Sequence, residues 1–417
     1  MAEQGGGAAA EWRRYWFLPL VAGMGYATSA LQSYGFGPFF QPLQDDFGWT
    51  RAQVATGITI SNLGAALFIP FIGALIDRYG PRPLGIVGVS AFLIAYGLLS
   101  VATGTHWDWW LHWAGIAVAT SCLQGTIWTG AVVSRFLLSR GMAIGVTVSG
   151  LSVAIAILPP LTTWLIINHG WRGGFLGIAL IWAAVVLPML FLFFRGAQDD
   201  LLKARRQGIV DEHVELPGVS RSDGLRSPAY FKLLFISFTF AFCTIASVIH
   251  FVPMLGSFGA TPMAAAWVAT FIGIFSILGR LGTGALLDRL PAHLVGTVVY
   301  MIPVAGAVAL LIDGTSITNQ IIAAISLGLT VGAEADVIIY LITRHFGLRS
   351  FGTLMSVAFA SMAFGSAAGP YVAAMIFDAS GDYFPYIWLT IGLTTLSAII
   401  LLGLRCPPLS ETSAKPA

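Results

Sequence analysis

Long apolar runs separated by short polar stretches fill most of the chain. Twelve of these runs are long and apolar enough for a helix that spans a bilayer, which needs about 20 mostly apolar residues. They lie at about 15–42, 53–77, 84–103, 109–134, 142–168, 173–195, 229–257, 263–288, 294–312, 318–343, 351–377 and 384–405. Aromatic residues gather near several run ends, as in interfacial belts, at Trp12, Trp16, Trp107, Trp109, Trp110, Tyr383 and Tyr386. The pattern predicts an all-α membrane protein with twelve transmembrane helices.

The composition indicates that lipid surrounds the chain. Its 417 residues are 57% hydrophobic and only 10% charged, whereas a soluble protein carries about 25% charged residues. Cys122 and Cys243 lie within apolar runs and Cys406 lies near the carboxyl end, so no disulfide framework is expected. The sequence has no metal-ligand spacing and no phosphate-binding loop. We therefore expect no metal, no cofactor and no nucleic-acid partner.

The basic residues predict how the chain is oriented. With the amino terminus in the cytoplasm, all of the 21 Lys and Arg except Arg51, Arg172 and Arg280 fall in cytoplasmic segments or at inner helix ends. Arg51 and Arg172 fall outside, and Arg280 falls within the membrane. This bias is the positive-inside pattern of membrane proteins. It predicts a multi-pass protein of the cell membrane, plasma or inner, with both termini in the cytoplasm.

The two halves of the chain repeat each other. The segment "FQPLQDDFG" at 40–48 returns as "FVPMLGSFG" at 251–259, and "GALIDR" at 73–78 returns as "GALLDR" at 284–289, both with an offset of 211. Parallel six-helix repeats are a transporter architecture with the site between the halves, near the bilayer midplane. We expect a tail at 1–14, a six-helix bundle at 15–195, a cytoplasmic linker at 196–227, a second bundle at 228–405 and a tail at 406–417.

Two motifs resemble a known superfamily. "GALIDRYGPRP" at 73–83 is similar to the signature of the loop between helices 2 and 3 in the major facilitator superfamily, and "RGMAIGVTVSG" at 140–150 resembles its Gly-rich helix 5. The arginine of helix 8, the histidine of helix 7 and "GAEADVIIYLITRHFGLRSFGTLMS" at 332–356 resemble the monocarboxylate transporters, including bacterial lactate/pyruvate porters, and the oxalate:formate antiporters. Ser276 stands where the animal monocarboxylate transporters have an aspartate. The resemblance implies transport by alternating access.

Arg280 is the strongest candidate for a functional residue. The repeat pairs Arg280 with Ile69, His250 with Phe39, Glu334 with Gly125 and Asp336 with Ile127. The scaffold can therefore be built without these ionisable groups, and a charge near the bilayer centre normally faces a cavity or a partner. A guanidinium can hold a carboxylate with two parallel hydrogen bonds. A standing salt bridge to Glu334 or Asp336 is the alternative, since all three lie roughly 12–15 Å from the inner helix ends.

Other residues are candidates for proton coupling, the pocket and the gate. His250 could carry a proton or donate a hydrogen bond to substrate, or it could bond to a neighbouring helix. Of the two helix 10 carboxylates, Asp336 is favoured as the partner that exchanges Arg280 for a proton, and Glu334 as part of a structural network. The expected pocket lining consists of Tyr26, Tyr34, Asn62, Gln124, Ser276 and Phe359. The expected cytoplasmic gate consists of Asp77, Arg78, Arg82, Asp288 and Arg289.

These features predict a proton-coupled symporter for a small monocarboxylate such as lactate or pyruvate. We expect a monomer whose partners are the organic anion, the proton and membrane lipid. The apolar run at 351–377 carries no charge, and one permanent cation suits one carboxylate. Dicarboxylate exchange of the oxalate:formate type is the alternative, with a protonated His250 as the second cation; drug transport is a weaker one. An enzyme is not expected, because no nucleophile–base pair or metal cluster stands out in the sequence.

Overall fold

The described part of the protein is helical. The computed structural model describes residues 8–133, 135–136, 139–195, 219–287, 289–346 and 351–404, and within these ranges it contains helices and no strand. This confirms the predicted all-α class. The chain divides into two compact units: Met1–Gly48 with Ile60–Asp211, and Trp49–Thr59 with Glu212–Ala417. The start of the second membrane helix therefore belongs to the second unit, although the rest of that helix belongs to the first.

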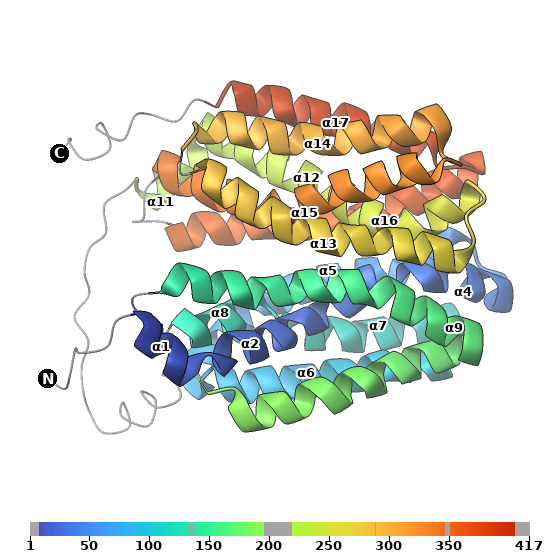
Figure 1. The fold of residues 1–417 in the computed structure, drawn as a ribbon, viewed down its shortest axis with the longest axis horizontal. Helices are drawn as coiled ribbons and strands as arrows, with labels where there is room; N and C mark the ends of the chain where they lie inside the picture. Colours follow the sequence, from blue (N-terminus) through green and yellow to red (C-terminus); the bar gives the residue numbers. More distant parts are fainter. Residues whose placement is uncertain are drawn as a thin grey trace, which may run out of the picture. The chain divides into compact units, whose positions relative to one another are not determined.

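The first unit is built from helices of very different lengths (Figure 1). They are α1 (Ala8–Tyr15), α2 (Phe17–Ala27), α3 (Leu31–Tyr34), α4 (Phe40–Phe47), α5 (Arg51–Tyr79), α6 (Pro81–Leu98), α7 (His106–Ser121), α8 (Gly125–Val133) and α9 (Arg140–Phe193). The predicted run at 15–42 is broken by 3₁₀ turns at Thr28–Ala30 and Gly37–Phe39. The runs at 142–168 and 173–195 both lie in α9, where Gly170 (φ 68°, ψ 174°) interrupts the helical backbone.

Besides the start of α5, the described residues of the second unit form one short helix and six long ones. They are α11 (Arg221–Arg226), α12 (Pro228–Ser257), α13 (Pro262–Leu287), α14 (Ala292–Asp313), α15 (Ile317–Phe346), α16 (Phe351–Ser380) and α17 (Phe384–Leu402). Within this unit α12 packs against α16 and α17, α13 packs against α15, and α14 packs against both α15 and α17. Figure 1 shows these six long helices running along one another as a bundle.

The sequence repeat also appears in the backbone. Gly48 (φ 67°) and Gly259 (φ 92°) are 211 residues apart, and so are Gly170 (φ 68°) and Gly381 (φ 80°). All four have a positive φ, which side chains other than glycine rarely tolerate. Equivalent turns of the two halves thus both place a glycine with a positive φ at the same position of the repeat.

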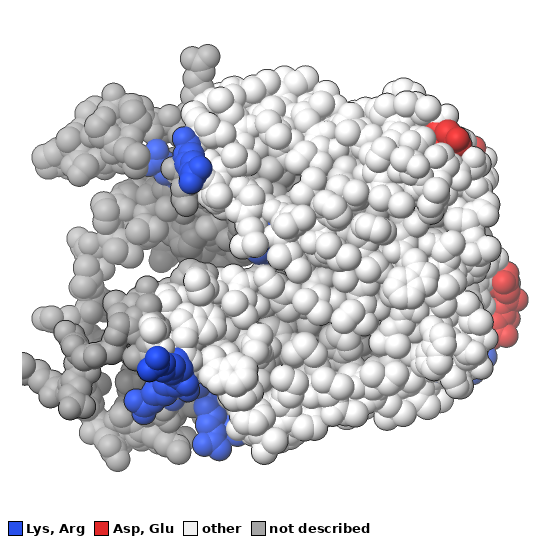
Figure 2. Space-filling view, viewed as in Figure 1, with Lys and Arg blue, Asp and Glu red and all other residues white. Residues whose placement is uncertain are grey.

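The helices fit a membrane environment. Eight helices in the described ranges are long and apolar enough to cross a bilayer, and one of them, Met142–Phe193, covers 52 residues and includes Gly170. The count of twelve spans stays a prediction. In each unit, the middle of the face in Figure 2 is almost free of charged side chains. The predicted aromatic belt is wrong for Trp109, Tyr383 and Tyr386, which are buried inside their bundles, whereas Trp107 is 79% exposed.

Candidate functional site

Arg280 lies in the second half of α13, seven residues before the helix ends at Leu287. Its side chain is partly buried. Ser276, one turn earlier, is fully buried, and its hydroxyl donates to the Gly273 carbonyl of the same helix at 2.8 Å. The only hydroxyl proton of Ser276 is therefore already used within α13, which leaves Arg280 as the stronger of the two predicted substrate ligands.

The backbone of α15 lies directly against the turn of α13 that carries Arg280. A Cβ atom added at Gly332 would overlap the Ser276 carbonyl and would lie 2.8 Å from the Arg280 backbone nitrogen. Only glycine allows so close an approach. Glu334 and Asp336 follow Gly332 on α15 by two and four residues, and their side chains lie outside the described residues. The predicted proximity of this stretch of α15 to Arg280 thus holds at the level of the backbone.

His250 lies seven residues before the end of α12 and is fully buried. Its Nε2 is 2.9 Å from the Pro370 carbonyl oxygen of α16, and its Nδ1 is 2.8 Å from the Tyr383 hydroxyl, in the turn before α17. The Tyr383 hydroxyl also accepts a hydrogen bond of 2.6 Å from Nη1 of Arg51. His250 thus bonds to neighbouring elements, which is the structural one of its two predicted roles. The Tyr383 phenol also connects it to Arg51 of α5.

Arg51 is held in place by several groups of the second unit. Its side chain is only 7% exposed, and its guanidinium carbon stands 3.6 Å from the centre of the Phe377 ring. The Asp378 carboxylate accepts hydrogen bonds from the backbone N–H groups of Arg51 (3.0 Å) and Ala52 (2.8 Å), the first residues of α5. A carboxylate at this end satisfies free N–H groups and complements the helix dipole.

We call Arg51, Asp378, Tyr383 and His250 the Arg51 cluster. It joins the start of α5 to α12, α16 and the turn before α17. Burial raises the pKa of the Tyr383 phenol well above its usual range, so Tyr383 keeps its proton and can donate it in a hydrogen bond. The sequence marked Arg51 only as a basic residue outside the membrane and Tyr383 only as an interfacial aromatic, because their partners are far away in the chain.

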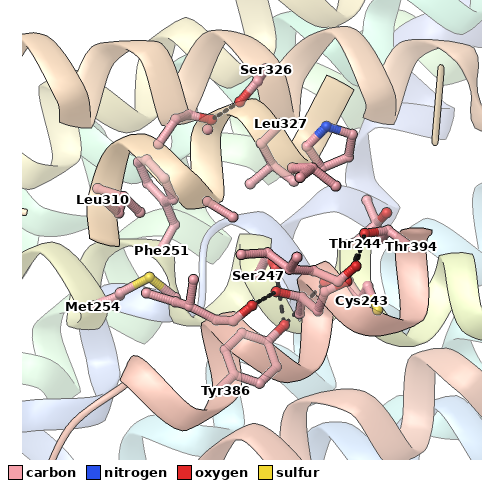
Figure 3. A pocket seen from close by; sticks show the side chains of 18 of the residues that line it. Cys243, Thr244, Ser247, Phe251, Met254, Leu310, Ser326, Leu327, Tyr386 and Thr394 are labelled. Carbon is pink, nitrogen blue, oxygen red and sulfur yellow. Dashed lines mark hydrogen bonds between the residues drawn. The ribbon is translucent and has the colours of Figure 1, made fainter. Parts of the chain in front are cut away.

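A cavity lies within the second unit, between α12, α14, α15 and α17 (Figure 3). Its volume is about 60 Å³, which is room for a few water molecules. The Tyr386 hydroxyl, at its edge, lies 3.0 Å from Ser247 Oγ and donates to the Cys243 carbonyl at 3.1 Å. Neither Arg280 nor His250 is among the described residues that line it, so it is separate from the predicted substrate ligands.

In the first unit, a polar cluster surrounds a residue that sequence reasoning missed. Gln32 is buried, and its Oε1 accepts hydrogen bonds from Ser61 Oγ (2.7 Å) and Thr120 Oγ1 (3.1 Å). The predicted pocket residues Tyr34 and Gln124 are both partly buried. Phe359, on α16 of the second unit, is 45% exposed.

The structure describes only part of the predicted gate. Arg82 Nη2 donates to the Phe191 carbonyl at 2.8 Å, in the last turn of α9 and within the same unit. This bond satisfies a carbonyl at the negative end of a helix. Arg289 is exposed in the turn after α13. The side chains of Asp77, Arg78 and Asp288 lie outside the described residues.

Comparison with known proteins identifies the family. The model of the Major Facilitator Superfamily matches residues 22–325, and the chain belongs to this superfamily. Monocarboxylate transporter 13 of Bos taurus is 28% identical over 343 residues, which are 78% of this chain and 69% of that protein. The oxalate:formate antiporter of Oxalobacter formigenes is 24% identical over 252 residues, which are 59% of this chain and 56% of that protein.

A solved structure supports the same fold. The crystal structure of a D-xylose-proton symporter matches with a TM-score of 0.74 at 11% identity and covers 95% of this chain and 99% of its own. The protein is thus a multi-pass membrane transporter of small molecules, similar to the monocarboxylate transporters, and not an enzyme.

Proposed function

We propose that the protein carries a small monocarboxylate, such as lactate or pyruvate, together with a proton by alternating access. In this proposal Arg280 binds the carboxylate, because a guanidinium stays charged and fits a carboxylate with two parallel hydrogen bonds. The similarity to monocarboxylate transporter 13 supports this substrate class. Pairing each anion with one proton keeps transport electroneutral and avoids a cost of about 2.3 kcal/mol per charge for each 100 mV.

The position of Arg280 carries the proposal. It is a permanent cation about 10 Å from the inner end of a membrane helix, on a partly buried side chain. A cation in that position normally faces a cavity or a partner, and the equivalent residue of the other half is Ile69. The fold therefore does not require a charge there, whereas an anionic substrate does.

Exchange of dicarboxylates is the second candidate. The similarity to the oxalate:formate antiporter favours it. A dicarboxylate needs two cationic partners, but residues 351–377 of the helix 11 region carry no charge. His250 could supply the second cation only when it is protonated. A single permanent arginine favours a monocarboxylate.

Substitution of Arg280 tests the proposal in liposomes that contain the purified protein. Arg280→Lys keeps the charge but loses the paired geometry, and a hydrogen bond to a charged group is worth about 1.5–3 kcal/mol. We therefore expect labelled lactate uptake, driven by an inward proton gradient, to fall about tenfold or more. Arg172→Lys is the matched control, because Arg172 forms its ion pair with Asp46 (2.8 Å) within the first unit, and it should leave uptake nearly unchanged.

A double substitution separates the proposal from a standing salt bridge. If Arg280 only balances Asp336, removing one partner of a buried pair costs about 3–5 kcal/mol. Arg280→Ala would then deplete the folded protein, and Arg280→Ala with Asp336→Ala would restore both folding and uptake. A folded double variant without uptake supports the carboxylate-binding role of Arg280. Recovery of uptake in that variant rules this role out.

A further inference from the structure

The hydrogen bonds of the Arg51 cluster have a fixed direction. The Pro370 carbonyl can only accept, so His250 Nε2 carries a hydrogen and donates it across 2.9 Å. In a neutral imidazole Nδ1 is then an acceptor, and the Tyr383 hydroxyl is its donor at 2.8 Å. The Tyr383 oxygen in turn accepts from Arg51 at 2.6 Å. With His250 neutral, each of these three contacts therefore has one donor and one acceptor.

We propose that His250 is a proton-binding site that competes with Arg51, so that proton uptake at Nδ1 releases the start of α5 from α16 and the turn before α17. This inference deepens the proposed function, since it rests on transport being coupled to protons. It assigns the proton to one atom and adds Arg51, Tyr383 and Asp378 to the residues that control it.

Protonation of Nδ1 reverses one hydrogen bond. The new Nδ1–H must donate to the Tyr383 oxygen, which already accepts from Arg51, and the Tyr383 hydrogen then needs another acceptor. An imidazolium and a guanidinium would also face each other across a single phenol oxygen, and nearby like charges disfavour the charged form. Proton binding and the Arg51 contact therefore weaken each other by the same free energy.

The groups around His250 come from several elements. Arg51 contributes a positive charge from α5, Asp378 a negative charge from α16, and Tyr383 a neutral phenol from the turn before α17. Tyr386 of α17 bonds one turn earlier on α12, at Ser247. The Asp378 carboxylate accepts from two backbone N–H groups of α5, so its charge also serves to hold Arg51 in place.

Release of Arg51 can act on the whole transporter because of how α5 is divided. Its first residues, up to Thr59, belong to the second unit, and the helix continues from Ile60 in the first. Thr59 Oγ1 also donates to the Ala367 carbonyl of α16 at 2.8 Å. A movement of the first unit must therefore bend α5 near this point or detach its start. Detachment opens the Arg51 cluster at the end of α5 that we predict to lie outside.

The order of events follows from this competition. When the start of α5 is detached, a proton from the outer water binds Nδ1 and forms an imidazolium. When Arg51 returns, its charge displaces that proton to water, and Tyr383 again donates to Nδ1. The proton is taken up and given back without any other chemical change. Coupling to a gradient requires in addition that it is given back on the cytoplasmic side, while the outer end of the transporter is closed by the Arg51 cluster.

Spin labels can report the position of α5 without transport. The native cysteines are first removed from the full chain, and cysteines for the labels are introduced by Gln53→Cys and Ala379→Cys. Both positions line the same surface hollow. The labelled protein is measured in nanodiscs. We expect one short distance near pH 8 and a growing longer-distance population towards about pH 5. His250→Gln keeps a donor and an acceptor but does not titrate, and it should keep the short distance throughout. Tyr383→Phe removes only the hydroxyl that bonds to Arg51 and His250, and it should raise the longer-distance population even near pH 8.

The controls and contrary results are equally specific. Arg172→Gln changes the other outer arginine, which pairs with Asp46 in the first unit, and it should leave the response to pH unchanged. A distance that does not respond to pH, or a full response in folded His250→Gln protein, would overturn the proposal. Lactate uptake by the same labelled protein in liposomes separates the two hypotheses. A pH response at α5 without proton-driven uptake contradicts only the proposed function. Proton-driven uptake with an α5 distance that does not respond to pH contradicts only the role of His250 and Arg51 proposed here.

Discussion

An arginine side chain in an apolar bundle is stabilised by hydrogen-bond acceptors and by aromatic rings against its guanidinium group. Both kinds of contact are found at Arg51 and at Arg172. Arg51 lies against the Phe377 ring and bonds to Tyr383. Arg172 bonds to Asp46 and lies 4.0 Å from the centre of the Trp171 ring. A guanidinium is suited to such stacking, because it is planar and weakly hydrated. The two basic residues that are predicted to lie outside the membrane are thus each fixed by contacts within one unit.

The tautomer of His250 is a prediction at the scale of one residue. The Pro370 carbonyl requires a hydrogen on Nε2 of His250. When the His250 imidazole is neutral, ring ¹⁵N spectra should therefore show Nε2 protonated and Nδ1 unprotonated. His112 is an internal control with the opposite pattern, because its Nδ1 faces the Asp108 carbonyl at 2.8 Å. Tyr383→Phe should shift the His250 Nδ1 resonance and leave that of His112 in place. A hydrogen on Nδ1 of neutral His250 would contradict the assignment.

At this scale the sequence predicts single unusual residues but not their partners. Arg280 and His250 stand out because an ionisable residue in an apolar run is rare, and the repeat shows that their equivalents are apolar. Arg51 stands out in the sequence only as a basic residue that is predicted to lie outside the membrane. Its partner Asp378 lies 327 residues away, and a single sequence gives no signal for a contact over that separation.

The packing of α13 on α15 can be tested at the scale of helices. Gly332→Ala places a methyl group against the Ser276 carbonyl and the Arg280 backbone, and such overpacking costs about 1–3 kcal/mol. We expect a lower thermal unfolding midpoint in detergent. Gly282→Ala on α13 is the matched control, because nothing lies within 4 Å of its added Cβ, and it should change stability by no more than about 1 kcal/mol. Equal midpoints for the two variants would contradict the close approach.

Apolar periodicity predicts where long helices lie, but not where they break. The run at 229–257 agrees with α12, Pro228–Ser257, because Ser227 and Pro228 mark its start and Gly259, with φ 92°, follows its end. The breaks in the first run come from short 3₁₀ turns at Thr28–Ala30 and Gly37–Phe39, which lie inside a stretch whose overall apolar content predicts one helix. The capping of α5 also has no counterpart in the repeat, since the equivalent of Arg51 is Pro262, which has no N–H group to donate.

The predicted orientation is a property of the whole molecule. In a chain without other cysteines, a cysteine placed in the segment 196–227 should react with a membrane-impermeant thiol reagent only when the cytoplasmic side is exposed. Thr315→Cys, at an exposed position in the turn between α14 and α15, should react from outside intact cells. The positive-inside bias is the reason for this expectation. Labelling of the 196–227 segment in intact cells would overturn both the orientation and the pairing of spans.

The division of α5 between the two units also has a consequence for synthesis of the protein. A ribosome adds about 5–20 residues per second, and Asp378 follows Arg51 by 327 residues. The start of α5 therefore leaves the ribosome about 15–65 s before its partner does. During that interval the nascent chain holds a basic side chain whose final acceptors do not yet exist. The start of α5 can reach its final contacts only after α16 and the turn before α17 have been made.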